Sequence, residues 1–88
     1  MIEKEVIVTN TLGIHARPAT KFVKIASRYN CKVTVIKDGI EADGKSIMSL
    51  LILTATKGSR LIIRCEGPDE KKAIKELTKL VEEGFGEE

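Results

Sequence analysis

Residues 31–43 read CKVTVIKDGIEAD, and this stretch decides the fold. Residues 31–37 alternate between apolar and polar side chains, which is typical of a β-strand with one buried face. Asp38-Gly39 follows, and this pair favours the tight primed turn of a hairpin because glycine accepts a positive φ. Residues 40–43 then return as the partner strand. The stretch therefore predicts an antiparallel hairpin.

A second pattern overlaps the hairpin. Residues 39–46 read GIEADGKS, which has the G-x-x-x-x-G-K-S spacing of a phosphate-binding nucleotide loop. The hairpin accounts better for the same residues, because Gly39 completes the turn and the next four residues form the returning strand. Glu41 and Asp43 would also place two negative charges beside a phosphate. Ser46 precedes an apolar helical stretch at residues 47–53, so we expect it to be an N-cap whose hydroxyl remains open to a second role.

The same patterns extend to both ends of the chain. Residues 4–9 and 60–66 are predicted as strands. Apolar residues recur at helical spacing from residue 16 onward, with Pro18 in the first turn, and again after residue 69 up to a C′ glycine at Gly84. Phe85 is expected to fold back on Leu80 of that last helix. The order predicts an α+β sandwich, with helices covering one face of a mainly antiparallel sheet.

Size and composition limit the function. The chain has 88 residues, so we expect one domain over residues 1–88, too short for a nucleotide-hydrolysing domain with crossover helices. The net charge of +2 and the scarcity of aromatic residues argue against nucleic-acid binding. The longest apolar run, residues 50–53, is too short to insert into a membrane, and the charged start lacks a signal-peptide pattern. We therefore expect a cytoplasmic protein.

The two cysteines, Cys31 and Cys65, are far apart in sequence and form no C-x-x-C motif. Each lies in a stretch with strand character, so burial as a small hydrophobic residue is favoured over a disulfide or a metal pair. The single histidine, His15, has no second histidine near it. No metal site is therefore expected, and no cofactor.

The chemistry is expected at residues 13–20, which read GIHARPAT. If His15 is the N-cap of the helix, the N–H groups of Ala16 and Arg17 lack intrahelical partners and favour a bound anion. The same field favours a neutral imidazole, whose lone pair is a competent nucleophile. Arg17 can form a fork onto a phosphate or carboxylate. From these residues alone, His15 could instead serve only as a solvent-facing helix cap. Acyl-transfer catalysis is disfavoured, because no Ser-His-acid set can be named.

Two motifs resemble those of one family. Residues 13–19, GIHARPA, resemble the active-site signature of the phosphocarrier protein HPr family of the bacterial sugar phosphotransferase system. Residues 44–50, GKSIMSL, resemble its second signature, around a regulatory serine. The resemblance implies an open-faced β-sandwich of four antiparallel strands and three helices, in the order βαββαβα. It also implies a carrier, rather than an enzyme, that accepts a phosphoryl group from enzyme I, charged by phosphoenolpyruvate, and passes it to sugar-specific enzyme II A domains.

The resemblance also assigns roles to residues. It implies that His15 accepts the phosphoryl group through Nδ1, that Arg17 and the backbone of Ala16 and Arg17 hold the phosphate, and that a dedicated kinase phosphorylates Ser46. It also implies an exposed patch on which partners dock, which consists of Ile47, Met48 and Leu51 and which we call the apolar patch. Taken alone, apolar residues at such positions are more often part of the core. Polar and basic residues of the first helix would extend the docking face: Thr20, Lys21, Lys24 and Arg28.

Two positions depart from the family's pattern, and two functions stay open. Leu12 stands where many members have a small polar residue, and Ser49 stands where glycine is frequent. The chain is expected to be a monomeric phosphoryl carrier, or a regulatory module in which phosphorylated Ser46 recruits a transcription regulator and is controlled by a kinase/phosphorylase. A sugar-uptake role and a nitrogen-linked branch of the family are not separated by these residues.

Overall fold

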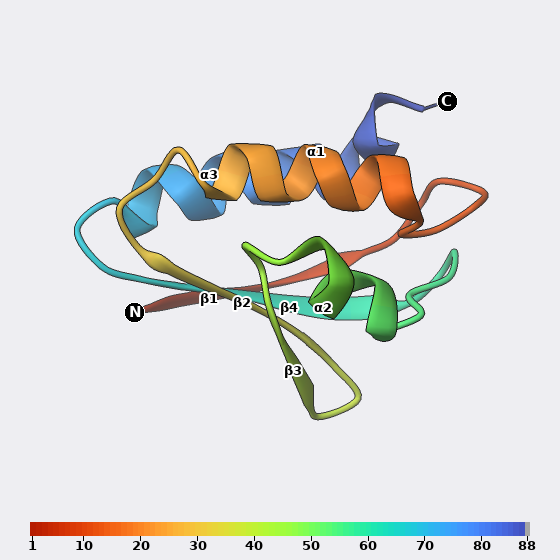
Figure 1. Cartoon of the computed structure of the whole chain (residues 1–88), viewed down its shortest axis with the longest axis horizontal. Coiled ribbons are helices and arrows are strands. Elements are labelled where there is room, and N and C mark those ends of the chain that lie inside the picture. The colour runs from red at the N-terminus through yellow and green to blue at the C-terminus, as the bar shows by residue number, and fades with distance from the viewer. Residues whose placement is uncertain (88) are drawn as a thin grey trace.

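The computed structural model describes residues 1–87 and has one four-stranded antiparallel sheet. The strands lie in the order β1-β4-β2-β3. Figure 1 shows α1 and α3 lying across one face of this sheet, with α2 beside them and no described element on the other face. The predicted βαββαβα order is confirmed. The elements are β1 (Ile2–Ile7), α1 (Ala16–Ala26), β2 (Lys32–Lys37), β3 (Ile40–Asp43), α2 (Ile47–Ile52), β4 (Arg60–Glu66), α3 (Glu70–Glu82) and the 3-10 turn η1 (Gly84–Gly86).

The hairpin predicted from the D-G pair is present. Asp38 and Gly39 both have positive φ, 51° and 79°, as a type I′ turn requires, and Lys37 pairs with Ile40 across it. The side chains of the two strands alternate across the sheet, which places Ala42 in the core at 7% exposed. The turn therefore sets the register that places Val33, Val35 and Ala42 in the core, although the predicted single buried face is incomplete because Thr34 between the two valines is also buried, at 6% exposed.

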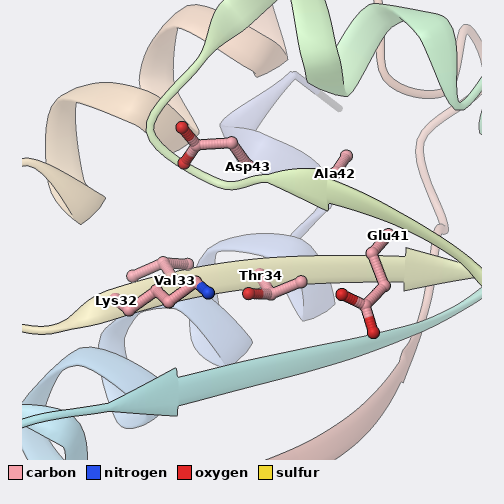
Figure 2. Close-up of a pocket in the computed structure, with 6 residues that line it drawn as sticks. All are labelled: Lys32, Val33, Thr34, Glu41, Ala42 and Asp43. Carbon is pink, nitrogen blue, oxygen red and sulfur yellow. The ribbon is translucent and has the colours of Figure 1, made fainter.

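The nucleotide-loop interpretation finds no support in the geometry. Four of its residues form β3, and Gly44 donates its N–H to the carbonyl of Val33 at 2.8 Å. A Cβ at Gly44 would lie 2.4 Å from Val33 Cγ1, so this glycine is needed for close packing on β2. The hollow beside it, about 290 Å³, has Glu41 and Asp43 in its lining (Figure 2). Two carboxylates there would repel a phosphate.

Element boundaries differ slightly from the predictions. The first strand begins at Ile2 rather than residue 4, because Ile2 pairs with Cys65 at the far end of β4. It ends at Ile7 rather than residue 9, although Val8 is 1% exposed and donates its N–H to the Ser59 carbonyl at 2.9 Å. The helix from residue 47 ends at Ile52, one residue before the predicted end.

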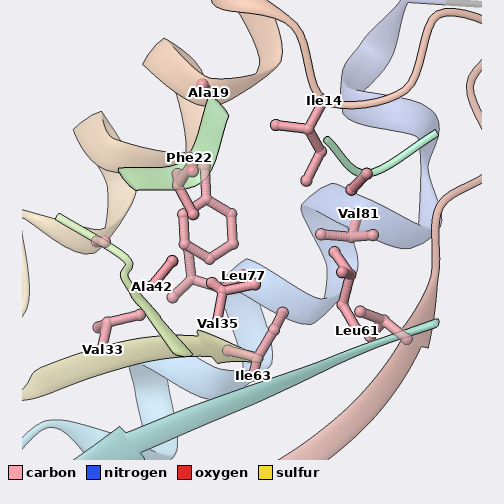
Figure 3. Packing of buried hydrophobic residues seen from close by; sticks show 14 of the residues in the cluster. Ile14, Ala19, Phe22, Val33, Val35, Ala42, Leu61, Ile63, Leu77 and Val81 are labelled. Atoms are coloured by element: carbon pink, nitrogen blue, oxygen red, sulfur yellow. The ribbon is translucent and has the colours of Figure 1, made fainter. Parts of the chain in front are cut away.

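The core lies between the sheet and the two long helices (Figure 3). Phe22 of α1 and Leu77 of α3 meet Ile63 of β4 there, and all three are at most 2% exposed. Leu80, predicted in the stripe of the last helix, is only partly buried, and Thr78 is buried instead at 3% exposed. Within the described residues, no helix is long and apolar enough to span a bilayer.

The two cysteines are free thiols and both are buried, as predicted. Cys31 is 8% exposed and Cys65 is fully buried. Burial, with a smaller contribution from the neighbouring Cys31 thiol, raises the pKa of Cys65 to about 12. Because both thiols are buried, neither is placed to react with groups at the surface. Across residues 1–87, no cluster of three or more His, Cys, Asp or Glu side chains is placed to hold a metal ion.

The chain turns sharply after α3 and returns to the start of α1. Gly84 is the predicted C′ residue, with φ of 64°, and Phe85 and Gly86 follow with φ of 58° and 72°. Phe85 is 1% exposed and belongs to the core, against which Leu80 packs. Figure 1 shows the C-terminal end beside the N-terminal end of α1. This buried aromatic therefore fixes residues 84–87 next to residues 13–20.

Candidate functional site

His15 is the N-cap of α1, as predicted. Its backbone is extended (φ −105°, ψ −167°), and its carbonyl accepts the first helical hydrogen bond from the Ala19 N–H at 3.0 Å. The preceding residue, Ile14, is buried and donates its N–H to the Ala55 carbonyl at 2.8 Å, which fixes the entry into the helix. The His15 side chain makes no capping hydrogen bond. Within the described chain, the N–H groups of Ala16 and Arg17 consequently have no acceptor, and the helix start is open to an anion.

The imidazole has one hydrogen-bond partner and one free nitrogen. Its Nε2 lies 3.1 Å from Oε1 of Glu87, and the His15 side chain is 37% exposed. Among residues 1–87, no group bonds to Nδ1. An ionised carboxylate can only accept, so Nε2 carries the proton of a neutral ring and Nδ1 keeps its lone pair. The Nδ1 nitrogen therefore has a lone pair that no described group occupies.

Glu87 is held by a buried asparagine. Asn10 is 1% exposed, and its Nδ2 donates to the Gly13 carbonyl at 2.7 Å and to Glu87 Oε1 at 3.1 Å. The Glu87 side chain is itself only 13% exposed. Neither Asn10 nor Glu87 is predictable as a site residue from the sequence, because Glu87 is 72 positions from His15 and no local pattern connects them. Its carboxylate also adds a negative charge beside the ring that opposes the field of the helix start.

An open pocket of about 420 Å³ surrounds these groups. Its lining comes from the loop before α1, from α1 and from the C-terminal segment: Leu12, His15, Arg17, Lys21, Gly86 and Glu87. Arg17 is exposed, and in the part of the chain that the structure describes it forms no ion pair. Lys21 instead donates from Nζ to the Phe85 carbonyl at 2.7 Å. A free imidazole nitrogen and an unpaired guanidinium thus lie in one pocket at the helix start whose N–H groups are open, and this combination suits a phosphoryl group.

Comparison with known proteins agrees with this chemistry. A family model described as "PTS HPr component phosphorylation site" matches residues 2–83. The chain belongs to the HPr family. It is 40% identical over 88 residues to the phosphocarrier protein HPr of Xylella fastidiosa (strain 9a5c), covering 100% of this chain and 99% of that protein. The HPr of Treponema pallidum (strain Nichols) is 41% identical over 88 residues and is covered completely, as is this chain.

The fold is that of solved HPr structures. The crystal structure of HPr-C-His from Thermoanaerobacter tengcongensis superposes with a TM-score of 0.96 at 41% identity, covering 100% of this chain and 99% of the other. The protein is therefore an HPr phosphocarrier of the phosphotransferase system, which carries a phosphoryl group rather than turning over a substrate as an enzyme does.

The second HPr-like signature begins a different helix. Ser46 is the N-cap of α2, as predicted, with an extended backbone (φ −126°, ψ 116°). Its Oγ accepts the Ser49 N–H at 3.2 Å. Serine at position 49 makes this bond with its backbone, so the departure from the frequent glycine leaves the cap intact. Ser46 does not line the His15 pocket.

The apolar patch is only partly as predicted. Met48 is 68% exposed and Ile47 is 36% exposed, but Leu51 is partly buried and packs against the core. Two further apolar residues are exposed, Ile52 of α2 at 72% and Leu12 of the His15 pocket at 73%. Of the residues proposed to extend the docking face, Thr20, Lys24 and Arg28 are exposed and Lys21 is partly buried.

Proposed function

We propose that His15 accepts the phosphoryl group of this HPr-family carrier through Nδ1. The observation that carries the proposal is the ring itself: Nε2 is occupied by Glu87, whereas Nδ1 has no partner among the described residues. The Nδ1 lone pair attacks the phosphorus, and the phosphate oxygens bind the N–H groups of Ala16 and Arg17 and the Arg17 guanidinium. At 37% exposed, the His15 side chain is accessible to a protein donor.

The donor and the acceptor are other proteins of the system. We infer that enzyme I, charged by phosphoenolpyruvate, phosphorylates His15 and that enzyme II A domains receive the phosphoryl group. Docking would use the apolar patch together with Thr20 and Lys24 of α1. The exposure of Met48 and Lys24 supports this surface, because a docking face must be free in the isolated chain. A cytoplasmic, monomeric, single-domain protein fits this exchange between partners.

The test is phosphorylation with purified components. The protein is incubated with enzyme I and phosphoenolpyruvate, and the site of acid-labile phosphate is mapped by mass spectrometry. Because the chain has one histidine, a phosphohistidine in it can only be His15. Labelling at residue 15 supports the proposal. Labelling elsewhere, or none with an enzyme I that labels a known HPr, contradicts it.

We also propose a regulatory role for Ser46. Its hydroxyl is partly exposed at the start of α2, directly before Ile47 and Met48 of the apolar patch. A phosphate there would place about two negative charges beside that patch. Enzymes that add and remove this phosphate, such as a dedicated kinase/phosphorylase, would then control docking, and a basic transcription regulator would gain charge-assisted bonds. The experiment is incubation with such a kinase, followed by mapping of acid-stable phosphate, which should lie on Ser46.

A further inference from the structure

We propose that Glu87 is a positioning residue for phosphoryl transfer. It fixes the His15 tautomer that leaves Nδ1 unprotonated, and it compensates the positive charge that the ring acquires when it is phosphorylated. This inference rests on the proposed role of His15. It adds a carboxylate from the other end of the chain that neither the motifs nor the family assignment identifies.

The direction of the hydrogen bonds is fixed by Asn10. Both atoms that contact its amide, the Gly13 carbonyl oxygen and Glu87 Oε1, are acceptors. Only the Nδ2 end of the amide can face them, and Oδ1 is left buried without a partner in the described chain. A buried polar atom without a partner costs stability, so the orientation is maintained by the two bonds that Nδ2 makes. Asn10 thus holds the loop and the carboxylate in one arrangement.

The backbone around Glu87 is also held. Phe85 is 1% exposed in the core, and its carbonyl accepts the Lys21 Nζ at 2.7 Å. The Glu87 N–H donates to the Gly84 carbonyl at 3.1 Å. The carboxylate is therefore presented by an anchored turn and is only 13% exposed, where its charge is screened less than at the open surface.

The transfer step balances with Glu87 in this place. The Nδ1 lone pair forms a bond to the phosphorus, while the bond from phosphorus to the donor atom that carried it breaks and its electron pair stays with the donor. His15 keeps its Nε2 proton, so the phosphorylated ring is an imidazolium. The ionised Glu87 accepts a hydrogen bond from that N–H and neutralises the new charge. The remaining charged groups of the pocket, Arg17 and Lys21, are cations and cannot do this.

Two substitutions distinguish the two roles of Glu87, which are to fix the His15 tautomer and to supply a negative charge. Glu87→Ala removes both the acceptor and the charge, whereas Glu87→Gln keeps an acceptor oxygen and removes only the charge. Glu83→Gln is the matched control, because Glu83 is exposed and lies on the same segment. The ¹⁵N resonances of the His15 ring report its tautomer, and the initial rate of labelling by enzyme I and phosphoenolpyruvate reports transfer. Thermal unfolding checks that each variant is folded.

We expect the parent and Glu83→Gln to hold the proton on Nε2 and to be labelled at equal rates. Glu87→Ala should show both tautomers and a rate lower by roughly tenfold, the size of one lost hydrogen bond to a charged group. Glu87→Gln should keep the tautomer and still lose rate. If Glu87→Ala keeps both the Nε2 tautomer and the rate, the inference is overturned, while labelling of the parent at His15 leaves the proposed function standing. Labelling of a His15→Ala variant would instead refute the proposed function, whatever the ring resonances show.

Discussion

The starts of α1 and α2 are built in opposite ways. His15 caps α1 with its backbone alone, so the N–H groups of Ala16 and Arg17 stay available. Ser46 caps α2 with its side chain, and its Oγ takes up the Ser49 N–H. A helix start whose donors are left open gives up a capping bond and gains an anion site, whereas a closed start uses the same donors for stability.

The largest expected effect is at the open start. His15→Ala should abolish labelling by enzyme I, because the chain has no other histidine. The fold should persist, since the His15 side chain makes no capping bond that alanine would remove. Phosphate incorporation and thermal unfolding measure the two effects. Phosphate labelling of the His15→Ala protein would contradict the proposal that the start of α1, and not that of α2, holds the phosphoryl acceptor for enzyme I.

Arg17→Lys should slow transfer to an enzyme II A domain by roughly tenfold, because an ammonium group keeps the charge but cannot form the bidentate fork. Arg60→Lys is the matched control, since Arg60 is exposed on β4 and does not line the pocket. Single-turnover transfer measures both variants. An unchanged rate for Arg17→Lys would mean that Arg17 contributes only its charge, or nothing, to holding the phosphate.

Ser46→Asp, as a weaker mimic of a phosphate, should slow labelling of His15 by a few fold. The added charge lies beside the apolar patch and disfavours a partner with an apolar or acidic surface. The effect should weaken as salt is raised, because exposed charges are screened. Lys72→Gln is the control, because it lowers the charge by the same one unit at an exposed position of α3 that does not line the His15 pocket. The measurement is the initial rate of His15 labelling at low and high salt. Equal rates for Ser46→Asp and the parent at both salt concentrations would mean that Ser46 serves only as a helix cap.

The smallest expected effect is on stability, and it compares the contributions of the two N-caps to folding. Ser46→Ala removes a side-chain cap and should lower the free energy of unfolding by about 1 kcal/mol. His15→Ala should cost less from capping, because its side chain contributes no such bond. Urea denaturation of the two variants measures the difference. A larger loss for His15→Ala would show that the Glu87 contact matters more for folding than the Ser46 cap does.

Local patterns predicted the elements and both caps, and they did so for local reasons. The D-G pair specifies its turn through the φ values of two adjacent residues, and the N-caps follow from the residues directly beside them. Local reasoning also singled out His15 and Arg17, and the family resemblance then implied their roles. The groups around His15 could not be predicted from local patterns. Asn10 and Glu87 are 77 positions apart in the sequence, and only the fold brings them into contact.

The apolar patch shows a second limit. The α2 helix has six residues, less than two turns, so periodicity alone cannot define which of its apolar side chains face the core. Leu51 packs inward, while Ile52, the next residue, is 72% exposed. A longer helix would have revealed the buried face from its repeating pattern, as it did for α3 at Ala73, Ile74 and Leu77.

The 72-residue separation between His15 and Glu87 gives the site an order in time. A ribosome adds the histidine 72 positions before the glutamate. Until Phe85 has entered the core and brought Glu87 beside the ring, the imidazole has no described partner to select its tautomer. A nascent chain that does not yet include Glu87 would therefore display the complete signature motif and yet be a poor phosphoryl acceptor.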